Sequence, residues 1–422
     1  MTQQLAPDKY LQSLMSRGIR LDLNAVRAAF AALDNPERSY PAVLIAGTNG
    51  KGSVAAMTAA ILNAAGRSVG LYTSPHLTDV RERIRIDGEM ISPHELTAAV
   101  NAVAPRLPEP LTYFEFLTVL AGFYFRQRGI DIAVVEVGMG GRLDATREFA
   151  AAVTVITNLS LDHQEFLGTR LAEIAGEKAA IIPAGGQCIT GVRQRGAGGI
   201  IAAACRERGA GLLRLGREIK VYRRRGGTFS WRCADRHLSG LHCGLVGAHQ
   251  QQNAALAIAA AATTTSGGPD IGNEAIRKGL AGVKWEGRLE ILQENPTVLV
   301  DGAHNPSGIG SLCRALQREY SFRSLIVVFG VLRDKHYRDM LKRMAALNPR
   351  MILTCPGSDR ALPPAELLPL AGEFSVAAEA VTVPAAALQR ALAIARADDL
   401  ICVTGSLYLV GEIKKLFLPG KP

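Results

Sequence analysis

The chain has 422 residues, 48% of them hydrophobic and 20% charged, and 48 Lys and Arg against 38 Asp and Glu give a formal net charge of +10. This composition is typical of a globular protein with a large core and two or three domains. No run approaches the roughly 18 apolar residues of a membrane-spanning helix, and the chain begins with no secretory signal, so we expect no membrane association. Seven scattered cysteines without a CxxC pair favour a cytoplasmic protein without structural zinc.

The positive charge is densest at residues 214–236. A basic surplus suits nucleic acid, a polyanionic small molecule, or no specific partner. The segment has few aromatic residues and is otherwise strand-like. We therefore interpret it as a solvated sheet face and expect no nucleic-acid partner.

Residues 8–33 have apolar side chains near helical spacing and predict a helical segment. The apolar run 43–46 then predicts a strand, which leads into the glycine-rich sequence GTNGKGS at 47–53 and an alanine-rich helix. In such a strand–loop–helix unit, backbone N–H groups at the helix N-terminus cradle phosphates.

Four residues of this loop carry the expected chemistry. Gly50 and Gly52 let the backbone approach phosphate oxygens closely. Lys51 would reach the β- and γ-phosphates of a nucleotide, and the Ser53 hydroxyl would ligate magnesium. The spacing departs from the GxxxxGK[ST] pattern, and a tight strand-to-helix turn is the alternative.

Strands and helices alternate beyond the loop. The strands are expected at 69–72, 131–137 and 152–157. One helix is expected to start at 92, a second at 112, and a third to span 171–181. This alternation predicts a doubly wound α/β domain with ligands at the carboxyl ends of its strands. Ser74, Glu136 and His163 all fall at such ends.

Glu136 closes a buried strand, where an uncompensated carboxylate is costly and a metal ion would compensate it. Ser74 and His163 add a hydroxyl and an imidazole, with an ordinary turn as the alternative for each. Lys178 is ambiguous, because a helix lysine usually faces solvent. Glu115 is also ambiguous, because it can cap its own helix together with Thr112.

A small antiparallel excursion is expected at about 211–243, followed by a linker and a second α/β unit. Its strands are expected near 297–301, 324–329, 350–354 and 399–404. Asp301 ends the first of these strands and would accept hydrogen bonds from a ribose or a cation. His304 would orient an acyl phosphate or a substrate carboxylate, with a plain turn as the alternative.

Together these segments resemble the folylpolyglutamate synthase/dihydrofolate synthase family, the folate branch of the Mur ligase superfamily. The matching strings run in family order and cover most of the chain: GTNGKGS (47–53), SPHL (74–77), RERIRIDGEMIS (81–92), TYFEFLT (112–118), EVGMGGRLDAT (136–146), LDH (161–163), GEKAAII (176–182), GAHQQQNA (247–254), WEGRLE (285–290) and DGAHNP (301–306).

The resemblance implies a P-loop-type ATP- and pterin-binding domain over 1–284 and a smaller Rossmann-like, glutamate-binding domain over 285–422. It implies ATP contacts at Gly50, Lys51, Gly52, Ser53, Asn253, Arg288 and Asp301, and magnesium ligands at Ser74, Glu136 and His163. The implied pterin contacts are Thr112, Tyr113, Phe114, Glu115, Leu143, Asp144 and Ala145. The implied catalytic residues are Lys51, Lys178, which resembles an N-carbamylated lysine, and His304; Ser406 joins His304 on the glutamate side.

The implied activity is the ATP-dependent addition of L-glutamate to dihydropteroate and to folates through an acyl phosphate. We expect two Mg²⁺ ions and a monomer, and a monovalent cation is a further candidate cofactor. A monofunctional folylpolyglutamate synthase, another Mur-type ligase of cell-wall precursors, and a P-loop regulatory or nucleic-acid-binding protein are the alternatives. One departure stands out: Glu286 lies where the family often has proline, so we expect a changed linker with the same role for Arg288.

Overall fold

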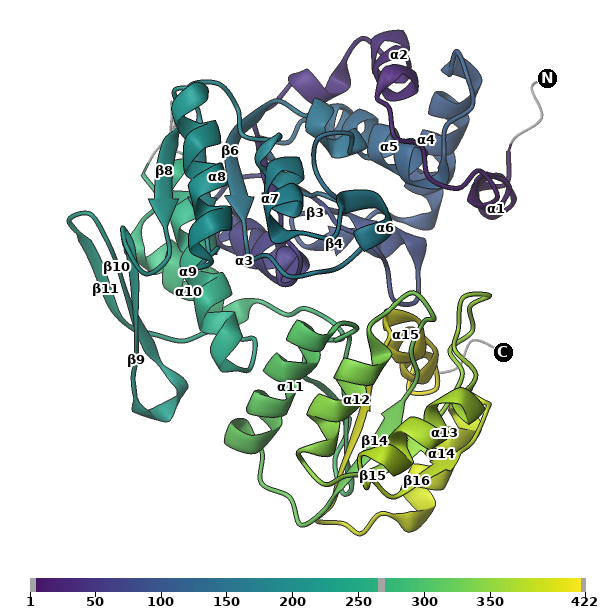
Figure 1. The fold of residues 1–422 in the computed structure, drawn as a ribbon. Coiled ribbons are helices and arrows are strands. Elements are labelled where there is room, and N and C mark those ends of the chain that lie inside the picture. Colours follow the sequence, from purple (N-terminus) through teal and green to yellow (C-terminus); the bar gives the residue numbers. More distant parts are fainter. Residues whose placement is uncertain (1–4, 265–269, 419–422) are drawn as a thin grey trace. The chain divides into compact units, whose positions relative to one another are not determined.

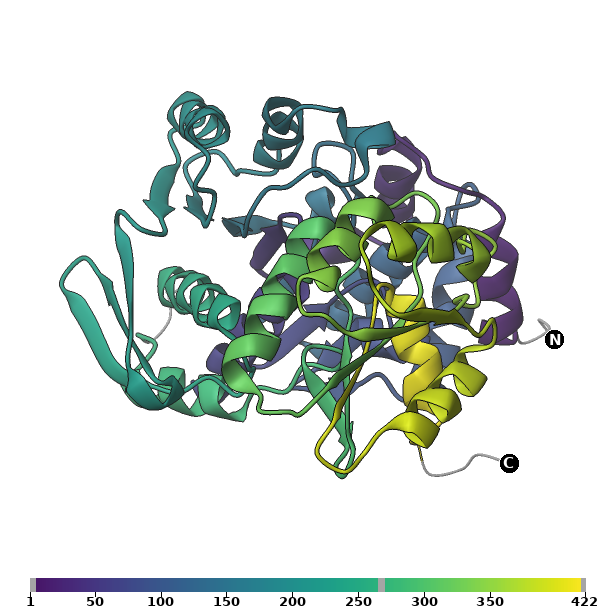
Figure 2. The same cartoon turned by 60° about the horizontal axis from the view of Figure 1, so that its bottom comes forward.

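The computed structural model describes residues 5–264 and 270–418. Two compact units form within this part of the chain (Figures 1 and 2). The first takes its described residues from Met1–His76, Val80–Gly244 and Gln250–Lys284, and the second takes them from Leu77–Asp79, Leu245–His249 and Trp285–Pro422.

An eight-stranded sheet forms the centre of the first unit, in the order β4-β3-β2-β5-β1-β6-β7-β8. Its strands are β1 (Ala42–Ala46), β2 (Val69–Tyr72), β3 (Ile84–Ile86), β4 (Glu89–Met90), β5 (Ile132–Glu136), β6 (Ala151–Ile156), β7 (Gln187–Thr190) and β8 (Gly211–Arg214). The six strands from β2 to β8 in this order pair in parallel, and β3 and β4 are antiparallel. The continuous apolar runs of β1 and β5 match this arrangement, because parallel strands are covered on both faces.

Helices cover both faces of this sheet (Figure 1). They are α1 (Pro7–Met15), α2 (Asn24–Ala32), α3 (Lys51–Ala64), α4 (Pro93–Val103), α5 (Tyr113–Arg128), α6 (Gln164–Leu167), α7 (Leu171–Ala179), α8 (Arg195–Glu207), α9 (Ala248–Thr263) and α10 (Asn273–Gly282). The prediction of one helical segment over 8–33 is wrong, because α1 ends at Met15 and the connection to α2 contains Gly18, whose φ of +64° is not helical.

Helix α3 follows the glycine-rich loop and is buried along nearly its whole length. It contacts β1, β2, β5 and α10. A Cβ atom on Gly279 of α10 would lie 2.6 Å from the Cα of Ile61, so glycine permits the close approach of the two helices. This burial fixes the orientation of α3 and therefore the direction of the backbone N–H groups in its first turn, directly after the loop.

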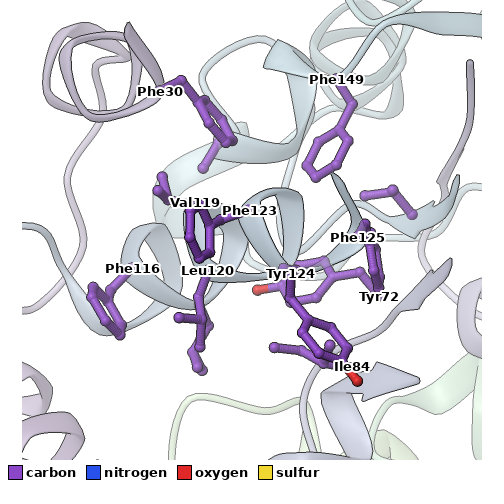
Figure 3. Packing of buried hydrophobic residues seen from close by; sticks show 14 of the residues in the cluster. Phe30, Tyr72, Ile84, Phe116, Val119, Leu120, Phe123, Tyr124, Phe125 and Phe149 are labelled. Carbon is purple, nitrogen blue, oxygen red and sulfur yellow. The ribbon is translucent and has the colours of Figure 1, made fainter. Parts of the chain in front are cut away.

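Helix α5 anchors the core on the opposite face of the sheet (Figure 3). Phe116, Leu120 and Phe125 of α5 are fully buried there, together with Phe30 of α2 and Tyr72 of β2. The helix begins with a capping box at Thr112, as its sequence predicts. This core holds the N-terminus of α5 close to the ends of β2 and β5.

A separate three-stranded antiparallel sheet contains β9 (Ile219–Arg223), β10 (Phe229–Cys233) and β11 (Arg236–Leu241). The expected excursion from about 211 starts too early, because Gly211–Arg214 pairs in parallel with β7 and extends the main sheet. The small sheet is fixed to α9 by Trp231, whose Nε1 donates to the Ala255 carbonyl oxygen at 3.1 Å. Lys220, Arg232 and His237 lie side by side on its exposed face.

The second unit has a six-stranded sheet in the order β12-β13-β17-β14-β15-β16, in which only β12 is antiparallel. Its strands are β12 (Glu290–Gln293), β13 (Thr297–Asp301), β14 (Leu325–Phe329), β15 (Arg350–Leu353), β16 (Ala378–Ala380) and β17 (Leu400–Thr404). Its helices are α11 (Pro306–Glu319), α12 (Tyr337–Ala345), α13 (Pro364–Glu373), α14 (Pro384–Ile394) and α15 (Leu407–Lys415).

Helices α11, α12 and α13 cover one face of this second sheet, and α14 and α15 cover the other. Both units are therefore doubly wound α/β folds, which confirms the predicted fold class. Among the residues that the structure describes, no helix is both long and apolar enough to traverse a bilayer.

Candidate active site

The glycine-rich loop turns from β1 into α3 in a conformation that needs glycine at two positions. Gly47 and Gly50 have φ values of +143° and +83°. A Cβ on Gly47 would lie 1.9 Å from Thr157 Oγ1, and one on Gly50 would lie 2.8 Å from Asn253 Oδ1. Because the N-cap residue is Gly50, no N-cap side chain covers the first backbone N–H groups of α3, and this end of the helix favours an anion.

The end of strand β6 fixes the loop from the other side. Asn158 Oδ1 accepts a hydrogen bond from the Asn49 backbone N–H at 3.0 Å, and Asn158 Nδ2 donates to the Asn49 carbonyl oxygen at 2.8 Å. Thr157 Oγ1 donates to the same oxygen at 2.7 Å. We did not identify this role of Asn158 from the sequence, although a polar residue directly after a buried strand is a usable signal.

Helix α9 contacts the first turn of α3 through two buried amides. Gln250 Nε2 donates to Ser53 Oγ at 3.4 Å, and Asn253 Nδ2 donates to Gln250 Oε1 at 2.9 Å. Gln250 therefore links Ser53 and Asn253, two residues that are expected to contact ATP. Gln250 was missed, although two amides three residues apart in an alanine-rich helix mark a polar face.

Lys51, Glu136 and Ser74 meet at the carboxyl ends of three neighbouring strands. Lys51 Nζ lies 4.0 Å from Glu136 Oε1 and 3.5 Å from the Thr48 carbonyl oxygen. Glu136 Oε2 accepts the Ser74 backbone N–H at 3.1 Å. The Glu136 side chain is 7% exposed. The site thus combines a buried carboxylate, an ammonium group and a hydroxyl residue beside the helix N-terminus.

His163 follows β6 with a φ of +50°, and its Nε2 lies 4.0 Å from Asp162 Oδ1. Its side chain is 42% exposed. Within residues 5–264 and 270–418, no three His, Cys, Asp or Glu side chains are grouped closely enough to hold a metal ion by themselves. A metal ion here would depend on hydroxyl, water or ligand oxygens as well.

Lys178 lies in the last turn of α7 and is buried, unlike an ordinary helix lysine. Burial and, to a smaller extent, the positive charge of Lys51 lower the pKa of its ammonium group to about 7, although Asp144 and Asp162 act in the opposite direction. A large fraction of Lys178 is therefore neutral near pH 7, and a neutral amine is a nucleophile.

The predicted pterin segment 112–115 forms the start of α5. Thr112 and Glu115 complete their capping box, with the Thr112 N–H donating to Glu115 Oε2 at 2.7 Å. The other carboxylate oxygen, Oε1, is buried without a hydrogen-bond partner in the described part of the chain. Arg20 Nε lies 3.9 Å from it. Capping therefore occupies only one of the two Glu115 oxygens.

Tyr113 and Phe114 present rings on the same turn. The Arg83 guanidinium lies 5.3 Å from the centre of the Tyr113 ring, in cation–π geometry. Phe114 lies against Gly138, where a Cβ would come within 2.6 Å of the ring. The turn thus offers aromatic surface and a cation beside the end of β5.

The second predicted pterin segment is the loop 143–145. Leu143 is 39% exposed and Ala145 is buried. The Asp144 carboxylate accepts the Met139 N–H at 2.8 Å and the Thr146 N–H at 3.0 Å, so it holds its own loop. Burial raises its pKa.

In the second unit, Asp301 and Arg288 lie at the carboxyl end of β13. Asp301 accepts the Leu289 N–H and the Ala303 N–H, each at 3.0 Å, and burial raises its pKa despite the nearby Arg288. His304 Nδ1 lies 2.9 Å from the Gly302 carbonyl oxygen.

Ser406 is buried at the N-terminus of α15, where its Oγ accepts the Tyr408 N–H at 3.1 Å. Ser406 follows β17, which pairs with β13, so it lies at the same sheet edge as Asp301.

Two family models match the chain. The Mur ligase middle domain matches residues 45–261, and the Mur ligase glutamate ligase domain matches residues 287–407. The first match covers the glycine-rich loop, Glu136 and Lys178. The second covers the region from Arg288 to Ser406.

Similar proteins agree with these matches. The dihydrofolate synthase/folylpolyglutamate synthase of Bacillus subtilis is 33% identical over 96% of this chain and 97% of its own length. A probable bifunctional folylpolyglutamate synthase/dihydropteroate synthase of Haloferax volcanii is 36% identical over 96% of the chain, which spans 49% of that longer protein. The structure of Mycobacterium tuberculosis folylpolyglutamate synthase complexed with ADP superimposes with a TM-score of 0.92, at 33% identity and full coverage of both chains.

Proposed function

Because the chain belongs to the Mur ligase family, in its folylpolyglutamate synthase/dihydrofolate synthase branch, we propose that it is an ATP-dependent ligase of L-glutamate. Its acceptors are dihydropteroate, which gives dihydrofolate, and reduced folates, which gain further glutamates. The observation that carries this proposal is the meeting of Lys51, Glu136 and Ser74 beside the uncapped N-terminus of α3.

The ATP phosphates are assigned to the loop from Gly50 to Ser53. The backbone N–H groups and the helix N-terminus favour their negative charge, and Lys51 adds a mobile cation. The ADP complex of the M. tuberculosis relative supports the use of ATP. Asn253 of the first unit and Arg288 and Asp301 of the second are the further ATP contacts of this proposal.

The residues present fit magnesium. Mg²⁺ prefers hard oxygen ligands and keeps several waters, so it does not need three acidic or imidazole side chains. Ser74 and Glu136 supply a hydroxyl and a buried carboxylate, and His163 adds an imidazole at the next strand end. When bound there, the two proposed ions would neutralise phosphate charge and polarise the transferred group.

In the reaction, a carboxylate oxygen of the pteroate or folate forms a bond to the γ-phosphorus of ATP, and the bond to ADP breaks. The glutamate amine then attacks the acyl carbon of the resulting acyl phosphate, loses a proton, and phosphate leaves. Lys51 stabilises the charge that gathers on the transferred phosphoryl group. His304 orients the acyl phosphate or the incoming carboxylate in this scheme.

Lys178 is proposed to carry a carbamate. A neutral lysine amine reacts with CO₂ by forming an N–C bond and losing a proton to solvent, so the neutral amine becomes a carbamate anion. The burial of Lys178 and its pKa of about 7 support this, because both favour the neutral amine. The product would give the site a second carboxylate-like group for magnesium.

The proposed substrate contacts are divided between the two units. Residues 112–115 and 143–145 in the domain 1–284 are assigned to the pterin, supported by the two rings and by the buried Glu115 Oε1, which accepts no hydrogen bond from the described residues. His304 and Ser406 in the domain 285–422 are assigned to glutamate. The seven cysteines form no disulfide, which suits the reduced cytoplasm, and a monomer completes the proposal.

The test is ADP release by the purified protein with Mg²⁺ and L-glutamate, comparing dihydropteroate, tetrahydrofolate and a muramyl nucleotide as acceptors. Both pterins should stimulate ADP release and gain the mass of one glutamate. Stimulation by tetrahydrofolate alone would reduce the proposal to a monofunctional folylpolyglutamate synthase. Stimulation by the muramyl nucleotide alone, or by none of the three, would overturn it.

A further inference from the structure

A buried ammonium group lies behind the turn that presents Arg288. Lys414 is in the last turn of α15, and its side chain is 9% exposed. Its Nζ lies 2.7 Å from Glu286 Oε2, and 2.8 and 3.1 Å from the two oxygens of Glu290. A buried ammonium group requires such partners, because its desolvation is otherwise costly.

The backbone is held on both sides of Arg288, and this cluster holds it on the Gly287 side. The Gly287 N–H donates to Glu290 Oε2 at 2.6 Å, so one carboxylate joins Lys414 to the turn. On the other side of Arg288, the Leu289 N–H is fixed to β13 by its hydrogen bond to Asp301.

The direction of the Arg288 side chain depends on this turn. Its Nη1 donates to the Gly287 carbonyl oxygen at 2.9 Å, and that oxygen also accepts the Gly302 N–H at 2.9 Å. A Cβ on Gly302 would lie 2.4 Å from Nη1, so the guanidinium rests directly on the backbone after β13. A rotation of the Gly287 peptide would therefore redirect the guanidinium.

The three charges of the cluster are not equivalent. The Glu286 side chain is 47% exposed, so its ion pair alone is worth little. Removing Lys414 is more severe, because it leaves the Glu286 and Glu290 carboxylates facing each other without a cation. Their repulsion would act on the residues on both sides of Gly287 and Arg288.

We propose that Lys414 is a positioning residue for the nucleotide: by neutralising Glu286 and Glu290 together, it fixes the turn 286–289 and the direction of Arg288. The inference rests on the proposed role of Arg288 as an ATP contact. It also explains how this chain stabilises the turn with glutamate at position 286, where proline would restrict the backbone directly.

Kinetics on Lys414→Met, Glu286→Gln and the double variant test the proposal, with Glu319→Gln, an exposed position on α11, as the control. Lys414→Met should raise the KM for ATP about tenfold while kcat and the KM for the pterin change less than about twofold. Glu286→Gln should have a smaller effect. The double variant should bind ATP better than Lys414→Met, since it lacks the repulsion. Additive losses, or an unchanged KM for ATP in Lys414→Met, would overturn it.

A second readout needs no turnover. The chain has two tryptophans, Trp285 beside the cluster and Trp231 in the small sheet of the first unit. In protein labelled with 5-fluorotryptophan, Lys414→Met and Glu286→Gln should shift or broaden the ¹⁹F signal of Trp285 and leave that of Trp231 unchanged. Two unchanged signals would overturn the positioning role, even where Lys414→Met folds poorly and only Glu286→Gln can be measured. If the wild-type protein has no ligase activity and the variants still shift the Trp285 signal, the result contradicts the proposed function and leaves the positioning role of Lys414 supported.

Discussion

Replacing Lys178 by methionine should abolish turnover and yet stabilise the fold, with an advantage that depends on pH. The unfolded chain holds the lysine proton with a pKa of 10.5, whereas the folded chain holds it with a pKa of about 7. Between these values the unfolded state binds more protons, so the free energy of unfolding of the wild type rises with pH. Below pH 7 both states are protonated, and the folded state contains the buried charge at its full cost.

The magnitude follows from the two pKa values. A difference of about 3.5 corresponds to at most roughly 5 kcal/mol near pH 6 to 7, and to roughly 2 kcal/mol at pH 9. Methionine has a similar length and no charge to desolvate. The free energy of unfolding of Lys178→Met should therefore exceed that of the wild type by up to these amounts. The advantage should shrink steadily as the pH rises towards 10.5.

The assay is urea unfolding between pH 6.5 and 9.5 in buffers free of CO₂ and metal, followed by the ¹⁹F signal of fluorinated Trp231, which reports on the first unit. Lys278→Met, at an exposed position on α10, is the matched control and should show no such trend. Added bicarbonate should change the wild type and leave Lys178→Met unaffected. A stability difference that does not vary with pH would refute the argument from burial.

Three further predictions concern the phosphate loop. Lys51→Ala should abolish turnover while the urea midpoint stays the same, and near-normal kcat would remove its phosphate role. Gly50→Ala should lower stability by about 1 to 3 kcal/mol and weaken ADP binding at least tenfold by calorimetry, because the new Cβ combines a strained φ with a clash against Asn253. Asn158→Ala removes two hydrogen bonds to Asn49 and should cost about 2 kcal/mol in urea unfolding; wild-type stability and ADP affinity would contradict its role.

Local signals were sufficient for much of the fold. The Thr112 and Glu115 pair marks the start of α5, because a capping box involves only four consecutive residues. The apolar runs of β1 and β5 predict buried parallel strands, and polar residues after them predict the site edge. The boundary of the small sheet was wrong because the short segment Gly211–Arg214 carries no sign of which neighbour it pairs with.

The parts of the site that the sequence did not predict depend on contacts between segments that are far apart in the chain. Gln250 donates to Ser53 across 197 positions in the sequence, and no spacing rule predicts such a pair. The burial of Lys178 likewise depends on what surrounds α7, whereas its helix position alone favours solvent. Glu286 could be recognised from the sequence as a departure, but its partner Lys414 lies 128 residues further along the chain.

The burial of α3 along nearly its whole length limits how far this helix can move. Any displacement of this helix would open its contacts with three strands and with α10, where Gly279 leaves no free space. The phosphate loop is therefore expected to be rigid within its own unit, because α3 holds its C-terminal end and Asn158 holds it through hydrogen bonds to Asn49. Structural responses to nucleotide in this unit should appear in less constrained segments, such as the exposed turn at His163, and hydrogen exchange with and without ADP would map them.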